Sequence, residues 1–185
     1  MFKDEMAHAS VLVTGGAGFV GGNLVRRLLT YDVQMVHIVD NLLSAERSNI
    51  PNDERVHFTH GSISDDKVLA TIHDTYDYIF HLSTYHGNQS SIANPLADHD
   101  NNTLTSLKLL ERVKDFKQLK KWVYSAAGCA VAEKTDQNAQ ATQEDAPISL
   151  NMDSPYSISK IIGEYYAVYY HERLGVPTVR ARFQN

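Results

Sequence analysis

A strand-like run that leads directly into a cluster of glycines constrains the fold of this chain more than any other feature. The apolar, β-branched sequence VLVT at residues 11–14 is followed by GGAGFVGG at residues 15–22, and a helical pattern comes next. Gly15, Gly18 and Gly21 are spaced three residues apart. Small residues at this spacing let the chain turn sharply, let a phosphate group approach the backbone, and let the helix pack closely on the strand. The segment predicts a strand–loop–helix unit whose helix N-terminus can bind an anion.

The next strand-like run ends in an acidic residue. VHIVD at residues 36–40 places Asp40 about twenty residues beyond the glycines. A carboxylate there accepts hydrogen bonds from adenosine ribose hydroxyls and repels a 2′-phosphate, so the pattern is a variant of the Rossmann dinucleotide-binding fingerprint and favours NAD over NADP. Arg47 lies a few residues beyond Asp40 and could bind a 2′-phosphate, so NADP stays an alternative to NAD. The other alternative is that the glycines only form a turn and bind no ligand.

Strand-like and helix-like segments alternate along the rest of the chain, as is typical of a doubly wound parallel sheet. We therefore predict an α/β fold of the Rossmann type, formed as one domain over residues 1–185. Further strands are expected at residues 55–59, 78–82, 121–125 and 177–183, helices at 64–74, 95–116 and 155–174, and a long polar loop at about 129–154. The stripe of Leu104, Leu107, Leu110 and Val113 predicts the sheet-facing side of the second of these helices, or alternatively a dimer face.

The composition excludes several classes of protein. Hydrophobic residues make up 43% and charged residues 21%, as in ordinary globular domains. A net charge of −5 without a basic stripe argues against a nucleic-acid partner. No apolar run is long enough to span a membrane, and the first residues lack a signal-peptide core. Cys129 is the single cysteine and the nine histidines show no ligand spacing, so we expect no disulfide, no metal site and a cytoplasmic location.

A second chemical signal lies at the start of the 155–174 helix. Tyr156 and Lys160 are four residues apart, so their side chains share one helix face. A nearby ammonium favours the phenolate and lowers the pKa of the tyrosine, which makes it a usable general base for an alcohol being oxidised to a ketone. By itself the Y-x-x-x-K spacing is common on solvated helix faces. Combined with the glycine loop, it predicts an oxidoreductase site.

These motifs together resemble the extended short-chain dehydrogenase/reductases, in particular the NAD-dependent nucleotide-sugar epimerase/dehydratase group. The resemblance covers essentially the whole chain, from the glycine loop through the segments DNL at residues 40–42, GSISD at 61–65, HLS at 81–83, NPL at 94–96 and SPYSISK at 154–160, to RFQN at 182–185. In that family, NAD stays bound and is used transiently. The sugar is oxidised, usually at C4, and the hydride then returns.

The resemblance assigns a role to individual residues of this chain. Tyr156 is implied as the base, Lys160 as the residue that holds the nicotinamide ribose, and Ser125 as a neighbour of the nicotinamide and a candidate catalytic residue. Asn185 matches a residue that contacts the substrate diphosphate, and His86 either lines the sugar pocket or is an exposed loop residue. The implied cofactor-binding residues are Gly15, Gly18, Phe19, Val20, Gly21, Asp40, Asn41, Ser62, Ile63, Leu82, Ser83, Thr84, Asn102, Ser125, Tyr156 and Lys160.

The chain departs from the family pattern at several functional positions. Ser62 stands where the family usually has Asp, which weakens one hydrogen bond to the adenine. Ala127 stands where a serine or threonine hydrogen-bonds the reacting hydroxyl, so Ser125, Cys129, Thr84 or a water substitutes, or the chemistry is altered. Gly128 and Cys129 occupy the places of the Asp-Glu pair that 4,6-dehydratases need to expel the C6 oxygen. The dehydratase reaction is therefore disfavoured.

The resemblance also implies a second lobe and a pairing mode. Relatives continue past the equivalent of Asn185 into a smaller C-terminal domain that binds the nucleotide sugar, and that lobe is absent from this chain. We expect either a fragment or a naturally shortened cofactor-binding half. Relatives form dimers through the helices expected at residues 95–116 and 155–174. The favoured function is a UDP- or NDP-hexose 4-epimerase, with a keto-sugar reductase or dehydrogenase, an NDP-sugar dehydratase and a non-catalytic NAD-binding protein as alternatives.

Overall fold

Six parallel strands form a single sheet in this computed structural model, which describes residues 2–85, 87–128, 144, 147–148 and 150–183. The strand order is β3-β2-β1-β4-β5-β6, so the direction of winding reverses between β1 and β4. Every neighbouring pair of strands is parallel. The strands are β1 (Ser10–Thr14), β2 (Met35–Asp40), β3 (Val56–His60), β4 (Tyr78–His81), β5 (Lys121–Ala127) and β6 (Thr178–Phe183).

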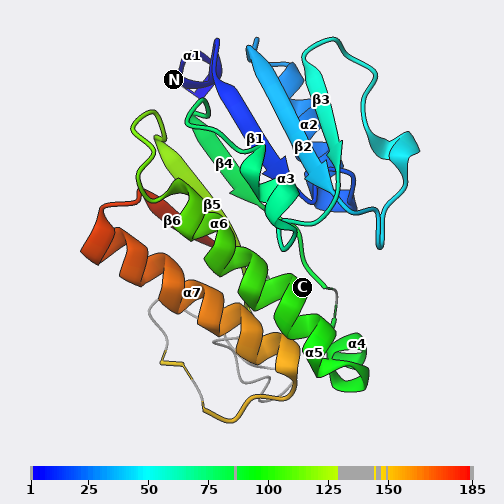
Figure 1. Ribbon diagram of the computed structural model, residues 1–185, viewed down its shortest axis with the longest axis vertical. Helices are drawn as coiled ribbons and strands as arrows, with labels where there is room; N and C mark the ends of the chain where they lie inside the picture. The colour runs from blue at the N-terminus through cyan, green and yellow to red at the C-terminus, as the bar shows by residue number, and fades with distance from the viewer. Residues whose placement is uncertain (1, 86, 129–143, 145–146, 149, 184–185) are drawn as a thin grey trace.

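Helices cover both faces of this sheet (Figure 1). They are α1 (Phe2–Met6), α2 (Phe19–Leu29), α3 (Asp66–Ala70), α4 (Asn88–Ala93), α5 (Pro95–Asp98), α6 (Thr105–Val113) and α7 (Pro155–Leu174), with the short segments η1 (Arg47–Asn49) and η2 (His99–Leu104). Within the described ranges, no helix has both the length and the apolar character needed to cross a membrane. The predicted doubly wound α/β fold is confirmed.

Two hydrophobic cores lie on the two faces of the sheet, and successive residues of β1 point into one or the other. Val11 and Val13 pack with Val25 and Leu28 of α2. Leu12 packs into the second core, which α3, α6 and α7 cover. All three β1 side chains are fully buried. Because both faces are covered, the strand is a continuous apolar run rather than an alternating one.

The helix expected over residues 95–116 is not one regular α-helix. It consists of α5, the π-helical segment η2 and α6, and it ends at Val113. The wider π turn shifts the phase of the residues that follow it. As a result, Leu110 and Val113 of the expected stripe are buried, but Leu104 and Leu107 are only half-buried. Ser106 and Leu109 complete the buried face instead.

The long helix α7 is fixed at its start and along its length. It begins at Pro155, as the sequence predicts, with Ser154 as the N-cap that accepts a hydrogen bond from the Ser157 N–H. Farther along, the buried Glu164 carboxylate accepts hydrogen bonds from Arg182 of β6 at 2.9 and 2.8 Å. This paired contact ties α7 to the edge strand β6.

A buried histidine, His37, lies on β2. Its ring nitrogens contact the Tyr76 hydroxyl at 2.6 Å and the Thr59 hydroxyl at 2.8 Å. Burial, with a smaller contribution from the charge of His57, lowers the pKa of His37 from 6.5 to about 4. The folded protein therefore keeps this ring neutral at pH values where the unfolded chain already binds a proton.

This difference predicts a pH-dependent stability. As the pH falls below 6.5, the unfolded state takes up a proton that folded His37 takes up only near pH 4. His37 alone should therefore lower the free energy of unfolding by about 2 kcal/mol between about pH 7 and pH 5. Urea unfolding at both pH values measures the loss. In His37→Phe, the loss of unfolding free energy between pH 7 and pH 5 should be about 2 kcal/mol smaller than in the wild type. In the control His73→Gln, which alters an exposed histidine, the loss should equal that of the wild type.

Candidate active site

The glycine loop connects β1 to α2 and packs against the residues that follow β4. Gly15 has a left-handed φ of +72°, and a Cβ placed on it would lie 2.6 Å from the Ser83 backbone nitrogen. A Cβ on Gly21 would collide with the Gly15 carbonyl oxygen. Gly18 is the N-cap of α2, which begins at Phe19. Gly15 and Gly21 therefore fill positions where a larger side chain is unfavourable, and the free N–H groups of α2 start at the loop.

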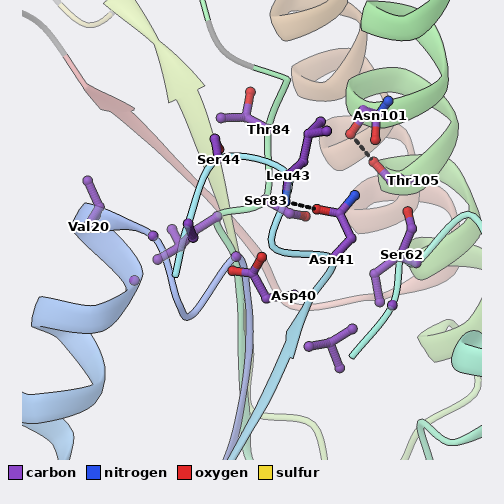
Figure 2. A pocket seen from close by; sticks show the side chains of 18 of the residues that line it. Val20, Asp40, Asn41, Leu43, Ser44, Ser62, Ser83, Thr84, Asn101 and Thr105 are labelled. Atoms are coloured by element: carbon purple, nitrogen blue, oxygen red, sulfur yellow. Dashed lines mark hydrogen bonds between the residues drawn. The ribbon is translucent and has the colours of Figure 1, made fainter. Parts of the chain in front are cut away.

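A cavity of about 420 Å³ opens beside this loop, at the carboxyl ends of the strands. Figure 2 shows Asp40, Asn41, Ser62 and Ser83 arranged around the same space. This is the crevice at the reversal of strand order where doubly wound sheets bind nucleotides. The cavity is lined by twelve of the residues that the sequence assigns to the cofactor: Gly15, Gly18, Phe19, Val20, Gly21, Asp40, Asn41, Ser62, Ile63, Leu82, Ser83 and Thr84.

Asp40 joins the end of β2 to the glycine loop. One carboxylate oxygen accepts a hydrogen bond from the Ala17 N–H at 2.9 Å, and the other accepts one from the Leu42 N–H at 2.9 Å. A carboxylate has about four acceptor positions, so about two remain for hydroxyl groups in the cavity that Asp40 lines. The Arg47 guanidinium lies over the Phe58 ring and does not line the cavity. The geometry suits a dinucleotide with a free 2′-hydroxyl.

Ser62 uses its hydroxyl locally. The Ser62 Oγ accepts hydrogen bonds from the Ser64 N–H at 3.2 Å and the Ser64 hydroxyl at 2.9 Å. This arrangement holds the turn after β3, and the buried Ile63 side chain packs into the core next to it. An aspartate at residue 62 would bring a longer side chain and a charge to the cavity wall, and the serine brings neither.

Asn102, which the sequence assigns to the nicotinamide half of the cofactor, lies in the π-helical segment. Its side-chain oxygen accepts hydrogen bonds from the Tyr85 N–H at 2.7 Å and the Thr84 hydroxyl at 3.0 Å. Its amide nitrogen donates to Asp98 at 2.7 Å and to the Ser159 hydroxyl at 3.3 Å. Asn102 is buried and does not line the cavity. Its carboxamide thus joins the chain after β4 to α7.

Tyr156 and Lys160 lie close together at the start of α7. The Lys160 ammonium is 5.7 Å from the centre of the Tyr156 ring and 5.3 Å from that of Tyr124. It donates a hydrogen bond to the Ser125 carbonyl at 2.9 Å and lies 3.5 Å from the Ser125 hydroxyl. The Tyr156 N–H donates to the Ser91 hydroxyl of α4 at 3.1 Å. Helices α4 and α7 and strand β5 therefore position this pair.

Ala127 is the last residue of β5 and pairs with Phe183 of β6. It leaves the expected hydroxyl position without an oxygen. Of the substitutes, the Ser125 hydroxyl is near Lys160, and the Thr84 hydroxyl donates to Asn102 at 3.0 Å. Cys129, His86 and Asn185 lie outside the described residues.

Sequence reasoning did not identify several polar residues that support the site. Asp98 and Ser159 contact Asn102, and Ser91 contacts the Tyr156 backbone. Helix α4, which carries Ser91, was also not expected. The four-residue spacing of Asp98 and Asn102 is a signal that was available, because such residues are neighbours on a helix.

The comparisons with known proteins agree on a family. Residues 11–185 match the family model described as the NAD dependent epimerase/dehydratase family. This chain belongs to that family. It is 29% identical over 178 residues to the UDP-glucose 4-epimerase of Lacticaseibacillus casei, which covers 95% of this chain and 51% of that protein. It is 28% identical to the dTDP-D-glucose 4,6-dehydratase of Dictyostelium discoideum, over 99% of this chain and 45% of that protein.

The match to one solved structure has a higher sequence identity. The Bordetella bronchiseptica enzyme WbmF, crystallised in complex with NAD+, is 58% identical with a TM-score of 0.87, over 98% of this chain and 51% of that chain. A second crystal structure of WbmF contains NAD+ and UDP. This chain therefore spans about half the length of the relatives that it matches.

The position of Asp40 predicts cofactor selectivity. Wild-type protein should bind NAD more tightly than NADP, because a carboxylate at this place accepts from ribose hydroxyls and repels a 2′-phosphate. Replacing Asp40 by Ala should narrow the gap between the two dissociation constants, measured by titration of each dinucleotide. Asp40→Asn keeps the shape of the side chain but not its charge, and its single oxygen can accept from only one of the two backbone N–H groups, so it should narrow the gap as well. Equal affinities in the wild type would contradict the assignment.

Proposed function

We propose that this chain binds NAD and forms the cofactor-binding part of a nucleotide-sugar 4-epimerase. The observation that carries the proposal is the Tyr156–Lys160 pair, held near the carboxyl end of β5 by the contact between Lys160 and Ser125. The cavity beside the glycine loop has the lining that the adenosine and pyrophosphate part of NAD requires. Relatives named as UDP-glucose 4-epimerases support the reaction class.

In this proposal, Tyr156 is the general base. Its phenolate oxygen takes the proton from the C4 hydroxyl of the sugar, and it returns a proton when the ketone is reduced. NAD supplies the hydride acceptor for this oxidation. The Lys160 ammonium, fixed by the Ser125 carbonyl, places a positive charge beside the phenol, which favours its deprotonated form. Epimerisation then requires that the hydride return to the opposite face of C4.

The substrate proposed is a UDP- or related NDP-hexose. The crystal structure of WbmF with UDP and the names of the epimerase relatives support the nucleotide part. In the same proposal the protein acts in the cytoplasm and pairs with a second copy through the α6 and α7 helices. Exposed Tyr165 and Tyr169 on α7 are suitable apolar contacts for such pairing.

A second candidate function has one observation in its favour. Ala127 removes a hydroxyl that would hydrogen-bond the reacting oxygen, and this favours a non-catalytic NAD-binding protein. The dehydratase alternative lacks such support, because Gly128 and Cys129 take the places of its acid pair. A keto-sugar reductase differs from an epimerase in releasing its cofactor after each turnover.

The epimerase proposal is tested in the protein encoded by the complete reading frame. Purified protein is incubated with UDP-hexoses, and C4 epimers are detected by chromatography. Cofactor that stays bound through purification supports the epimerase, whereas exchangeable cofactor with net reduction of a keto-sugar supports the reductase. Tight NAD binding without any turnover would favour the non-catalytic alternative.

The role of Tyr156 gives a sharper prediction. Tyr156→Phe removes only the hydroxyl, so turnover should fall by roughly a hundredfold or more while NAD affinity stays nearly constant. The matched control is Tyr165→Phe, which changes an exposed tyrosine on the same helix and should keep wild-type turnover. Steady-state rates and NAD titration measure the two effects. Wild-type turnover in Tyr156→Phe would contradict the role of Tyr156 as the base.

A further inference from the structure

A series of buried hydrogen bonds next to the cavity connects Thr14 of β1, His81 of β4 and Ser106 of α6. The Thr14 hydroxyl is 2.7 Å from Nδ1 of His81 and 3.0 Å from the Ser83 hydroxyl. On the other side of the imidazole, Nε2 of His81 is 3.0 Å from the Ser106 hydroxyl, which in turn is 2.6 Å from the Asn102 carbonyl oxygen. Thr14, His81 and Ser106 are fully buried, whereas Ser83 lines the cavity.

The Asn102 carbonyl at one end of this series fixes which group donates in each hydrogen bond. A carbonyl oxygen has no proton to give, so the Ser106 hydroxyl must donate to Asn102. The Ser106 oxygen then meets Nε2 of His81 as an acceptor, so Nε2 must carry the proton. Burial, reinforced by the charge of Lys160, lowers the pKa of His81 to about 3, so the ring has one proton only. Nδ1 is therefore a bare acceptor.

The same reasoning continues from the imidazole to the cavity. At 2.7 Å from the bare Nδ1, the Thr14 hydroxyl must donate its proton to His81. Its oxygen is then left as an acceptor for the Ser83 hydroxyl at 3.0 Å and the Ser83 N–H at 3.4 Å. The Ser83 proton thus points inward, away from the cavity. Only the lone pairs of Ser83 remain for a ligand.

We propose that His81 is a positioning residue for the cofactor: through Thr14 it orients the Ser83 hydroxyl so that Ser83 offers an acceptor, and not a donor, to the bound dinucleotide. The group that Ser83 receives is then a hydroxyl or amide N–H of NAD. This inference rests on the proposed binding of NAD and adds a residue that does not contact the cofactor. Without the imidazole, the Thr14 proton would turn to Ser83 and force the Ser83 proton into the cavity.

A double-mutant cycle on NAD affinity tests the proposal. Ser83→Ala should weaken NAD binding about threefold to tenfold, the usual effect of one hydrogen bond. His81→Phe should cause a loss of similar size in the wild type but less than a further twofold loss in the Ser83→Ala background, because the two residues act as one unit. Thr14→Val should show the same coupling to Ser83, and it replaces His81→Phe in the cycle if that variant does not fold. Equal losses with and without Ser83 would overturn the proposal.

His37→Phe is the matched control for the cycle. His37 is also a buried histidine with two hydrogen-bonded ring nitrogens, but it lies on β2 and its partners are Tyr76 and Thr59, neither of which lines the cavity. Its replacement should lower stability without any coupling to Ser83. Coupling of the same size in this control would show that loss of a buried histidine is sufficient, and the proposal would fail.

A direct measurement needs neither a variant nor a cofactor. The ¹⁵N chemical shifts of the His81 ring report which nitrogen carries the proton, and we expect the Nε2–H form throughout pH 5–8. A proton on Nδ1 would overturn the inferred orientation of Thr14 and Ser83. The measurement also separates the two proposals: protein that binds no NAD would contradict the proposed function, while the ring shifts would still decide the orientation.

Discussion

The close contact between the glycine loop and the chain after β4 is the constraint on which the site depends. Gly15 lies so near the Ser83 backbone that no side chain fits between them, and this contact occurs where the order of the strands reverses. It brings the end of β1, the start of α2 and the end of β4 to one edge of the sheet. The cavity exists because these three segments meet there, and Asp40 joins the glycine loop to the end of β2 in its wall.

The Tyr156–Lys160 pair, to which we assign the proposed catalysis, depends on a second group of contacts, farther along the same edge. Lys160 is buried, and a buried ammonium is unfavourable unless polar atoms compensate for the lost water. The Ser125 carbonyl and the flanking aromatic faces provide that compensation. At the other end of α7, the pairing of Glu164 with Arg182 fixes the helix against β6. The orientation of Tyr156 is thus set by contacts that span half of the sheet.

The sequence predicted the glycine loop, the acidic end of β2 and the start of α7, because these features depend on residues close together in the chain. The glycine spacing, the acidic end of β2 and the N-terminus of α7 at Pro155 all follow from steric and capping preferences of neighbouring residues. The π-helical segment and helix α4 could not be predicted in this way. Asn102 lies in a π turn, and its carboxamide is hydrogen-bonded to Tyr85 and Ser159, which are distant in sequence. Hydrophobic periodicity carries no information about such partners.

In the π-helical segment η2, the number of residues determines which side chains face the site. A π turn contains one residue more than the α turn that it replaces, so deleting any one residue from His99–Leu104 would convert it to a regular helix. Every residue on one side of the deletion would then rotate by about 100° relative to the other side. Asn102 and Ser106 would no longer face Tyr85 and His81 together. The number of residues in His99–Leu104 therefore helps to set the position of Asn102 relative to Tyr85 and of Ser106 relative to His81.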